Sequence, residues 1–502
     1  MRSVARWIFF ATLAFAPWAY GGTTAISIET INWLLLTTLL LWVVELAINR
    51  RKPQFPRAVA VIVFCLLGVG GWMALNAFSM YDGAFHSFAP LRNFSSGAPG
   101  SVDFAISAAW MIRAALLLGV VLFVSDLSQD NVWLLRLWQA IGIVAGSIAL
   151  LGLLQKATGA GMIFWQDPSI RSVTTFFATF YYHANAGAFL NLVWPLTAGL
   201  AVRAFSTASG PGARAAWLSV FILNLAAVAA NTSRMAQLIA VGLFVALSWH
   251  LGPAIIRRFS RLQPNVALGG AAAILLTLFA LGQAVHLEQP LNRWARLSEQ
   301  VPIDARWLAS RVALSAVRDS GAFGFGPGTF RAVFPIYNSA ANHPVLDGWR
   351  FLHEDYLQTL LEWGWFGSAL WALLFFGGIA VAVRNLRRQS RFRRGQKFAT
   401  ANPSFGGSEV PPGRASVGQI SASQSFGIST FRSEWTPRRR VILPLILIAL
   451  VGVSVHALVD FPLQIMSIQL YLATYLGLCW GSPLWKTSGD QSIGKPEKLP
   501  SL

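Results

Sequence analysis

The sequence predicts an all-α integral membrane protein, a bundle of about twelve transmembrane helices with one large ordered loop outside the membrane. Two observations support this class. First, 55% of the 502 residues are hydrophobic and only 12% are charged, whereas soluble domains average about a quarter charged residues. Second, apolar stretches of about 18–22 residues recur along the chain, which is the length needed to cross about 30 Å of hydrocarbon.

The apolar stretches place the predicted spans along nearly the whole chain. They lie near residues 4–20, 28–48, 58–76, 104–125, 132–155, 186–202, 215–231, 235–251, 265–286, 356–383, 441–459 and 463–481. The first resembles a signal peptide, but Pro17 directly follows its Ala-x-Ala sequence and further spans come after it, so we predict an uncleaved helix. Cys65 and Cys479 fall inside spans, and the sequence predicts neither a disulfide framework nor a zinc site.

The formal net charge of +19 is concentrated in one set of loops. If the N-terminus is cytoplasmic, the inside loops carry many basic residues. They are Arg50, Arg51, Lys52, Arg57, Arg203, Arg214, Arg257, Arg258, Arg261 and the arginines of the loop 384–440. The positive-inside rule then predicts that both termini are inside. One inside loop departs from the rule, because it carries Asp126 and Asp130. This loop-by-loop distribution argues against nucleic acid as a partner.

Two long loops interrupt the spans. The inside loop, rich in Arg, Ser, Gly and Pro, is predicted to be disordered. The outside loop contains several tryptophans, an amphipathic segment at 304–319 and the turn GFGPGTF at 324–330, and we expect it to fold and to carry a site. The predicted division is 1–286 with nine spans, 287–355 as the outside loop, 356–383 as the tenth span, 384–440 as the basic loop, 441–482 with the last two spans, and 483–502 as a cytoplasmic tail.

Two arginines are candidates for binding an anion. Arg113 lies inside the fourth span, where a charge costs about 2.5–3.5 kcal/mol, so we expect either a structural ion pair or snorkelling, or a contact to an anionic lipid head group. Arg234 follows Asn231, Thr232 and Ser233 at the predicted start of a helix. A helix N-terminus attracts anions and a guanidinium suits phosphate oxygens; the alternative is a simple cap with an interfacial arginine.

The stretch FLHEDYLQTLLEWGWFG at 351–367 provides a candidate base. His353 precedes the tenth span, and an unperturbed histidine titrates near 6.5, which suits a general base. Glu354 and Asp355 either favour the first turn of the helix, orient the histidine or hydrogen-bond a sugar hydroxyl. Asp460, between the last two spans, either caps the last helix or pairs with an arginine.

These residues resemble, as a set, the O-antigen ligase and polymerase superfamily, and the resemblance covers roughly residues 175–480. The matching positions are Asn185, Ser233, Arg234, Arg311, Gly324, Gly326, Pro327, Gly328, Phe330, His353, Tyr356, Leu357, Glu362, Gly364, His456, Asp460, Phe461 and Gln464. Glu354 departs from the pattern, because the family usually has asparagine there.

The resemblance implies a metal-independent, inverting glycosyltransferase without a cofactor, in the bacterial inner membrane, with its active site facing the periplasm. The donor would be an undecaprenyl-diphosphate-linked glycan and the acceptor a lipid or glycan. His353, Arg234 and Arg311 would be catalytic. The substrate-binding residues would be Ser233, Glu354, Tyr356, Arg113, Asn185 and Asp460, with no metal ligands.

Two alternatives to a ligase remain open. A polymerase of the same superfamily would use the same chemistry with a different acceptor. A small-anion transporter belongs to another class, and it would place ionisable residues near the membrane midplane and break its helices with Gly or Pro. The candidate polar residues gather instead at one face, which favours a transferase.

Overall fold

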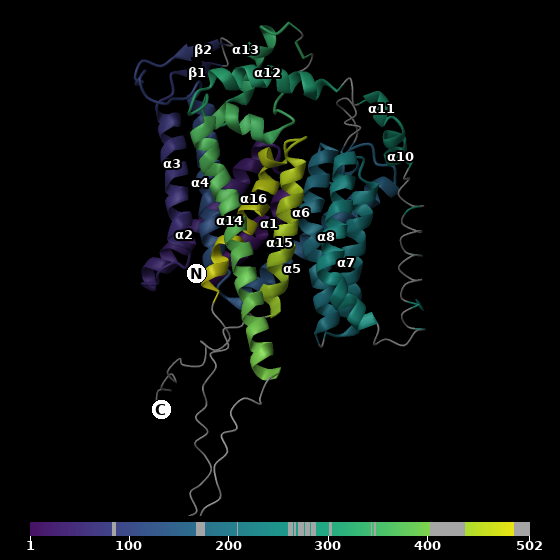
Figure 1. Ribbon diagram of the computed structural model, residues 1–502. Coiled ribbons are helices and arrows are strands. Elements are labelled where there is room, and N and C mark those ends of the chain that lie inside the picture. The colour runs from purple at the N-terminus through teal and green to yellow at the C-terminus, as the bar shows by residue number, and fades with distance from the viewer. Residues whose placement is uncertain are drawn as a thin grey trace, which may run out of the picture.

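The computed structural model describes residues 1–82, 87–166, 176–207, 209–259, 288–300, 304–342, 344–345, 348–401 and 437–485, with a few single positions between 260 and 287. Within this part, long helices run side by side as a bundle and shorter elements cover one end of it (Figure 1). The predicted helical membrane protein is confirmed.

The bundle follows the predicted spans closely. Its long helices are α1 (Arg2–Trp18), α2 (Ala25–Ile48), α3 (Arg57–Leu75), α4 (Phe104–Leu127), α5 (Asn131–Ala157), α6 (His183–Ser206), α7 (Pro211–Ala230), α8 (Arg234–Phe259), α14 (Asp355–Ala401), α15 (Pro437–His456) and α16 (Met466–Gly481). Eleven of the twelve predicted spans coincide with these helices, and the ninth, 265–286, lies outside the described residues except for a few single positions.

Nine helices of the described part are long and apolar enough to cross a membrane. The two others that match predicted spans, α1 and α16, are shorter, with 17 and 16 residues. The total of twelve spans therefore stays a prediction.

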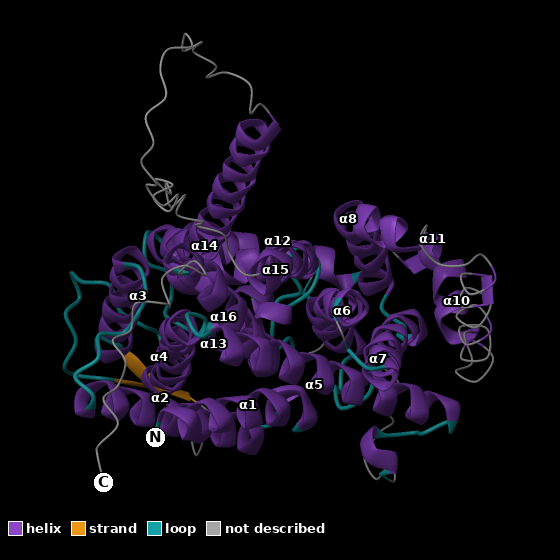
Figure 2. Cartoon of the chain, turned by 90° about the horizontal axis from the view of Figure 1, so that it is seen from below, coloured by secondary structure: helices purple, strands orange, loops and turns teal. Residues whose placement is uncertain are grey.

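Helix α16 lies at the centre of the bundle, where it packs against α1, α4, α6 and α14. Its buried aromatic side chains direct their polar atoms to carbonyl groups of neighbouring helices. Tyr471 donates to Leu13 O at 3.1 Å and Tyr475 to Leu192 O at 3.0 Å. Buried tyrosines need such partners, because an unpaired hydroxyl is costly away from water. Seen from below, α6, α7 and α8 form a group at one side of this centre, next to α10 (Figure 2).

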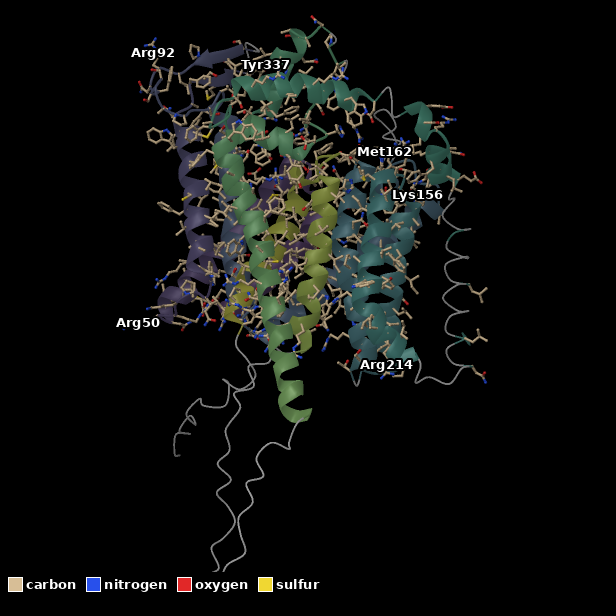
Figure 3. The ribbon with its side chains drawn as sticks, viewed as in Figure 1. Arg50, Arg92, Lys156, Met162, Arg214 and Tyr337 are labelled. Carbon is tan, nitrogen blue, oxygen red and sulfur yellow. The ribbon has the colours of Figure 1, made fainter. Side chains whose placement is uncertain are left out.

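The acidic loop that departs from the positive-inside rule is neutralised by arginines. Asp126 pairs with Arg51 at 2.7 Å and Asp130 with Arg6 at 3.3 Å. Arg50 and Arg214 lie at this same lower end of the bundle (Figure 3). The two aspartates therefore do not contradict the positive charge of this end, because each pairs with an arginine there.

The opposite end is covered by short elements. They are the hairpin of β1 (Ser79–Asp82) and β2 (Ser87–Pro90), and helices α10 (Glu288–Ala295), α11 (Leu297–Gln300), α12 (Ala305–Asp319) and α13 (Phe330–Ser339). Figure 1 shows α12 lying across the ends of the long helices. The helix predicted at 304–319 is confirmed, whereas the hairpin was not predicted.

Helix α14 runs to Ala401, past the predicted end of its span at 383. The prediction of a disordered loop from 384 onward is therefore wrong for 384–401, while residues 402–436 lie outside the described part. Arginine and glutamine are good helix formers, and extending an existing helix needs no new nucleus.

Candidate active site

Helices α12 and α13 form a second hydrophobic core with the first turns of α14. Its buried members are Ala309, Val312, Ala313, Ala316, Val317, Phe330, Val333, Phe334, Val345, Leu352 and Leu361. This core fixes the segment that ends at Leu352, directly before the predicted base, on the end of the bundle.

Gly364 breaks α14 into two segments, with φ 58° and ψ −168°. The break frees backbone groups of α14 that bond to the segment around the glycine turn: Glu362 O accepts from Gly326 N at 3.0 Å, and Phe366 N donates to Ala322 O at 2.9 Å. A Cβ on Gly364 would lie 2.4 Å from the carbonyl of Ala322. Only glycine fits here, and the broken backbone is satisfied by protein groups.

Gln358 and Glu362 lie one turn apart on α14 and form a polar stripe that joins two parts of the loop. Glu362 is 3% exposed, and its carboxylate accepts hydrogen bonds from Gly328 N at 3.0 Å, Phe330 N at 3.3 Å and Gln358 Nε2 at 3.0 Å. Gln358 in turn accepts from Leu352 N at 2.9 Å. The stripe therefore holds the glycine turn and the segment leading to the histidine in one arrangement.

His353 and Asp460 form the centre of the candidate site. His353 Nδ1 lies 2.9 Å from Asp460 Oδ1, and the side chains are 20% and 4% exposed. An ionised carboxylate only accepts hydrogen bonds, so Nδ1 carries a proton, and in the neutral imidazole Nε2 keeps its lone pair. The rings of Trp349 and Phe461 meet the imidazole edge-on, at centroid distances of 5.1 and 4.7 Å, and limit its rotation.

Asp355 attaches the segment 457–464, which contains Asp460, to the start of α14. Its backbone N–H donates to Ala457 O at 2.9 Å, and its fully buried carboxylate accepts from Leu463 N at 2.8 Å and from Gln464 Nε2 at 2.9 Å. Asp355 is thus a structural residue that sets the position of Asp460 relative to His353, which lies two residues before it.

Tyr182 and Arg306 extend the pair into a network. Tyr182 Oη donates to Asp460 Oδ2 at 3.3 Å, and Arg306 Nη2 donates to Tyr182 Oη at 2.7 Å. Arg306 Nη1 also donates to Val459 O at 3.1 Å. The network brings together the residue before α6, the first turn of α12, the residues before α14 and the loop after α15.

Asp460 and Arg306 each stabilise the charged form of the other. Burial raises the pKa of Asp460, but the hydrogen bond from His353 and the charge of Arg306 lower it below its ordinary value overall. Burial lowers the pKa of Arg306, and the charge of Asp460 raises it above its ordinary value. Burial, followed by the charge of Asp460, raises the pKa of Tyr182. The aspartate is therefore ionised and the tyrosine neutral at pH 7.

Two further arginines lie beside this network. Arg293 Nη1 is 3.0 Å from His183 Nε2. Burial lowers the pKa of Arg293, and the charges of Arg234 and Arg306 lower it further. The charges of Arg234 and Arg306 therefore lie close enough to disfavour the charge of Arg293, and a bound phosphate would relieve this repulsion.

Helix α8 begins at Arg234, as predicted. Ser233 is 5% exposed, and its Oγ accepts from Ala236 N at 3.3 Å, while Asn231 Oδ1 accepts from Ser233 N at 2.7 Å. Asn231 also donates through Nδ2 to His183 O at 2.9 Å. These caps fix the start of α8 against the start of α6, so Ser233 positions its neighbour Arg234.

The structure does not bring Arg311 to this site. Its side chain is exposed, and it makes no hydrogen bond or ion pair with another described residue. Arg306 stands in the network instead. The buried stripe of α12 distinguishes the two arginines: at 100° per residue, Arg306 is about 20° from Ala313, whereas Arg311 is about 160° from it. Helical periodicity could have found Arg306, but Arg293 had no comparable signal.

The other predicted binding residues have varied surroundings. Glu354 is a cap, because its carboxylate accepts from Tyr356 N at 3.2 Å and Leu357 N at 2.6 Å. Tyr356 Oη donates to Ser454 O at 2.9 Å. Asn185 is 3% exposed, and its Oδ1 has no hydrogen-bond partner among the described residues.

Arg113 is buried but forms no ion pair. Its Nη2 donates to Gln464 O at 2.8 Å, and within the described chain no carboxylate lies within 4.0 Å of it. The predicted alternative of a structural ion pair is therefore wrong for the part of the chain that can be seen. In the same part, no group of three or more His, Cys, Asp and Glu side chains is arranged to hold a metal ion.

Comparison with known families connects this geometry to an enzyme class. Residues 219–372 match the family model described as O-antigen ligase, whereas comparison with curated proteins gave no match. The matched segment contains Arg234, Arg293, Arg306 and His353, while Tyr182 lies before it and Asp460 after it. The resemblance to the superfamily is confirmed for residues 219–372, which match the O-antigen ligase family model.

Proposed function

We propose that the protein transfers a glycan from an undecaprenyl-diphosphate carrier to a hydroxyl group of an acceptor, in the manner of an O-antigen ligase. The observation that carries this proposal is the convergence of the His353–Asp460 pair with a cluster of three arginines, Arg234, Arg293 and Arg306. A base and a phosphate-binding cluster side by side are what glycosyl transfer from a diphosphate requires.

In the proposed step, Nε2 of His353 takes the proton of the acceptor hydroxyl. The hydroxyl oxygen bonds to the anomeric carbon, and the bond from that carbon to the diphosphate oxygen breaks. The electron pair leaves with the carrier diphosphate, whose charge the arginines stabilise. Asp460 stabilises the imidazolium that forms. Attack opposite the leaving group inverts the anomeric centre.

The arginine cluster also supports a metal-independent reaction. Divalent metal ions stabilise phosphate oxygens at many transfer sites, and here three guanidinium groups provide positive charge at the corresponding place. Arginine offers several donors in a planar fork that matches phosphate oxygens.

The site is assigned to the periplasmic face of the bacterial inner membrane. Arg50 and Arg214 lie at the end of the bundle opposite α12 (Figure 3). By the positive-inside rule that lower end is cytoplasmic. On this proposal both termini are cytoplasmic, and residues 287–355 form the outside loop that divides the chain.

The test uses purified protein in detergent with a synthetic undecaprenyl-diphosphate glycan, candidate acceptors and EDTA. Wild type is compared with His353→Gln and with His250→Gln. His250 is the control because it is exposed on α8, far from the start of that helix at Arg234. We expect His353→Gln to lower the transfer rate by about 10²–10⁴, the usual contribution of a general base, and His250→Gln to leave it unchanged.

The same assay addresses the alternative acceptor. A product mass with one glycan on a lipid core or protein indicates a ligase, whereas a ladder of repeat units on the carrier indicates a polymerase. Wild-type protein that transfers nothing to any acceptor, or an equal rate for His353→Gln, would contradict the proposal.

A further inference from the structure

Two cavities, each of about 390 Å³, meet at Arg113. Both are lined by Trp110, Arg113, Glu362 and Gln464, and together we call them the Arg113 chamber. Pockets of about 300–1,000 Å³ commonly hold small molecules. The chamber is separate from the candidate active site, because neither His353 nor Asp460 lines either cavity.

The guanidinium of Arg113 carries a charge that the protein leaves without a counter-ion. Arg113 is 7% exposed. It donates to Gln464 O at 2.8 Å, its Nε lies 3.1 Å from Met466 Sδ, and it stacks over Trp110 at 4.7 Å. All three partners are neutral, and no carboxylate of the described chain is within 4.0 Å. A buried charge of this kind is costly unless it is paired.

The two carboxylates that line the chamber are engaged elsewhere. Glu362 accepts three hydrogen bonds, two of them from the glycine turn. Asp103 caps α4 by accepting from Ile106 N at 2.7 Å, and its other oxygen accepts from Tyr81 N at 2.7 Å. Both acids are therefore held by backbone N–H groups, and Arg113 remains available to an anion from outside.

The two cavities differ in character. The outer one has Arg331 and Arg350 at its exposed rim. The inner one lies between α4, α14 and α16 and is lined by side chains such as Leu118, Trp371 and Phe375. A chamber with cations at one end and hydrocarbon at the other is complementary to an amphiphile with an anionic head group.

The depth of Arg113 fits this orientation. It lies nine residues after the start of α4, which is about 14 Å along the helix axis. There it contacts Gln464 and Met466, which stand at the outer end of α16. Arg113 is therefore level with the outer end of the short helix α16, although it lies well inside α4.

We propose that the Arg113 chamber binds the acceptor substrate as an anionic lipid, with its head group on Arg113 and its hydrocarbon chain between α4, α14 and α16. This inference rests on the proposed function, since it assigns the second substrate of that reaction. The donor diphosphate occupies the arginine cluster, so each lipid-anchored substrate has its own cationic site. Phe351 lines the outer cavity and Tyr356 the inner one, so the chamber's lining flanks His353 along the chain.

The experiment measures lipid binding without any donor, so that it does not depend on transfer. Radiolabelled dioleoylphosphatidylglycerol is titrated onto the purified full chain in detergent, in competition with dioleoylphosphatidylcholine or with inorganic phosphate. We expect phosphatidylglycerol to bind at least about tenfold more tightly than phosphatidylcholine, and inorganic phosphate at the same concentration not to displace it.

Variants locate the binding. Arg113→Gln is expected to weaken phosphatidylglycerol binding at least about tenfold, with Arg113→Lys in between. Arg136→Gln is the matched control, because Arg136 also stacks over a tryptophan, Trp133, at 4.7 Å but lines neither cavity. Ala372→Phe fills the apolar end without touching Arg113, and it is expected to weaken binding as well. Melting temperatures check that each variant is folded.

A transfer assay then separates the two proposals. Arg113→Gln is expected to raise the KM for a lipid acceptor while kcat and the donor KM change little. Equal binding of the two phospholipids, displacement by inorganic phosphate, or equal binding by Arg113→Gln and Arg136→Gln would overturn the lipid site. Binding that depends on Arg113 in a protein with no transfer activity would overturn the glycosyltransferase instead.

Discussion

The two ends of the bundle both carry buried charges, but their balance differs. At the lower end, Arg6 and Arg51 face three carboxylates, those of Glu45, Asp126 and Asp130. Arg6 and Arg51 each have at least one carboxylate within hydrogen-bonding distance. These closed ion pairs join α1, α2, α4 and α5.

In the network at the upper end, three arginines face two carboxylates, those of the buried Asp460 and the exposed Asp304. Arg234, Arg293 and Arg306 lie near one buried carboxylate, Asp460, which is itself hydrogen-bonded to His353. A structural network satisfies its own charges, whereas a binding site keeps charge for its ligand. The comparison teaches that burial alone does not distinguish the two; the balance of charge does.

The largest expected effect tests the excess of charge at the upper end. We expect Arg306→Gln to lower the transfer rate by about 10²–10³, the cost of removing one donor that stabilises developing charge. Arg311→Gln is the matched control, because the two residues share α12 but Arg311 is exposed away from the network. Steady-state transfer rates measure both, and equal losses would show that the position of the guanidinium is unimportant.

The second effect tests whether the lower end is only structural. Asp126→Asn removes the carboxylate that Arg51 binds at 2.7 Å. Breaking a buried pair costs about 3–5 kcal/mol of the free energy of unfolding. We expect a loss of about 3 kcal/mol, because Arg51 keeps Glu45 as a partner. Denaturant unfolding in detergent measures the free energy of unfolding.

The transfer rate per folded molecule of Asp126→Asn should stay within about twofold of wild type. A large loss of activity in folded protein would show that the two ends are coupled, and the division into a structural and a functional end would fail.

The third effect concerns the backbone that supports the upper end. Gly364→Ala forces alanine into a left-handed conformation with its Cβ 2.4 Å from the carbonyl of Ala322. We expect a loss of about 1–3 kcal/mol, typical of such strain, and a lower transfer rate, because the glycine turn moves. Gly68→Ala is the control: no atom lies within 4 Å of its added Cβ, and alanine favours a helix. Thermal melting compares them, and equal behaviour would mean that the break is unimportant.

Much of the fold could be predicted because the hydrophobicity of long segments dominates it. Crossing hydrocarbon demands long apolar helices, and this demand is visible in composition and length. The prediction failed at 384–401, where a polar segment continues a helix that hydropathy had ended. Hydropathy detects the membrane, and it does not detect helix propagation beyond it.

The site was predictable in its local parts and not in its assembly. The start of α8 and the glycine turn have short-range signals in caps and glycines. The pairing of His353 with Asp460 joins residues 107 positions apart, and Arg293 reaches the site from a short helix that no motif marked. Such contacts depend on packing between helices, which a single sequence does not encode in any local pattern.

The smallest expected effect uses pH to test the balance at the upper end. Burial raises the pKa of Asp460, and its partners lower it to a net value below that of an unfolded aspartate, which is about 3.9. A group with a lowered folded pKa contributes stability that is full above its unfolded pKa and is lost as the pH falls through its folded pKa. The difference in melting temperature between wild type and Asp460→Asn should therefore be constant from about pH 7 to 5 and shrink below about pH 4.

Glu288→Gln provides the control, because Glu288 is an exposed acid of α10, and its difference from wild type should stay small throughout. A difference for Asp460→Asn that grows as the pH falls would have the opposite sign. It would mean that burial outweighs His353 and Arg306, so that the carboxylate is harder to ionise in the folded protein than in the unfolded chain. Asp460 would then be less able to stabilise an imidazolium at His353.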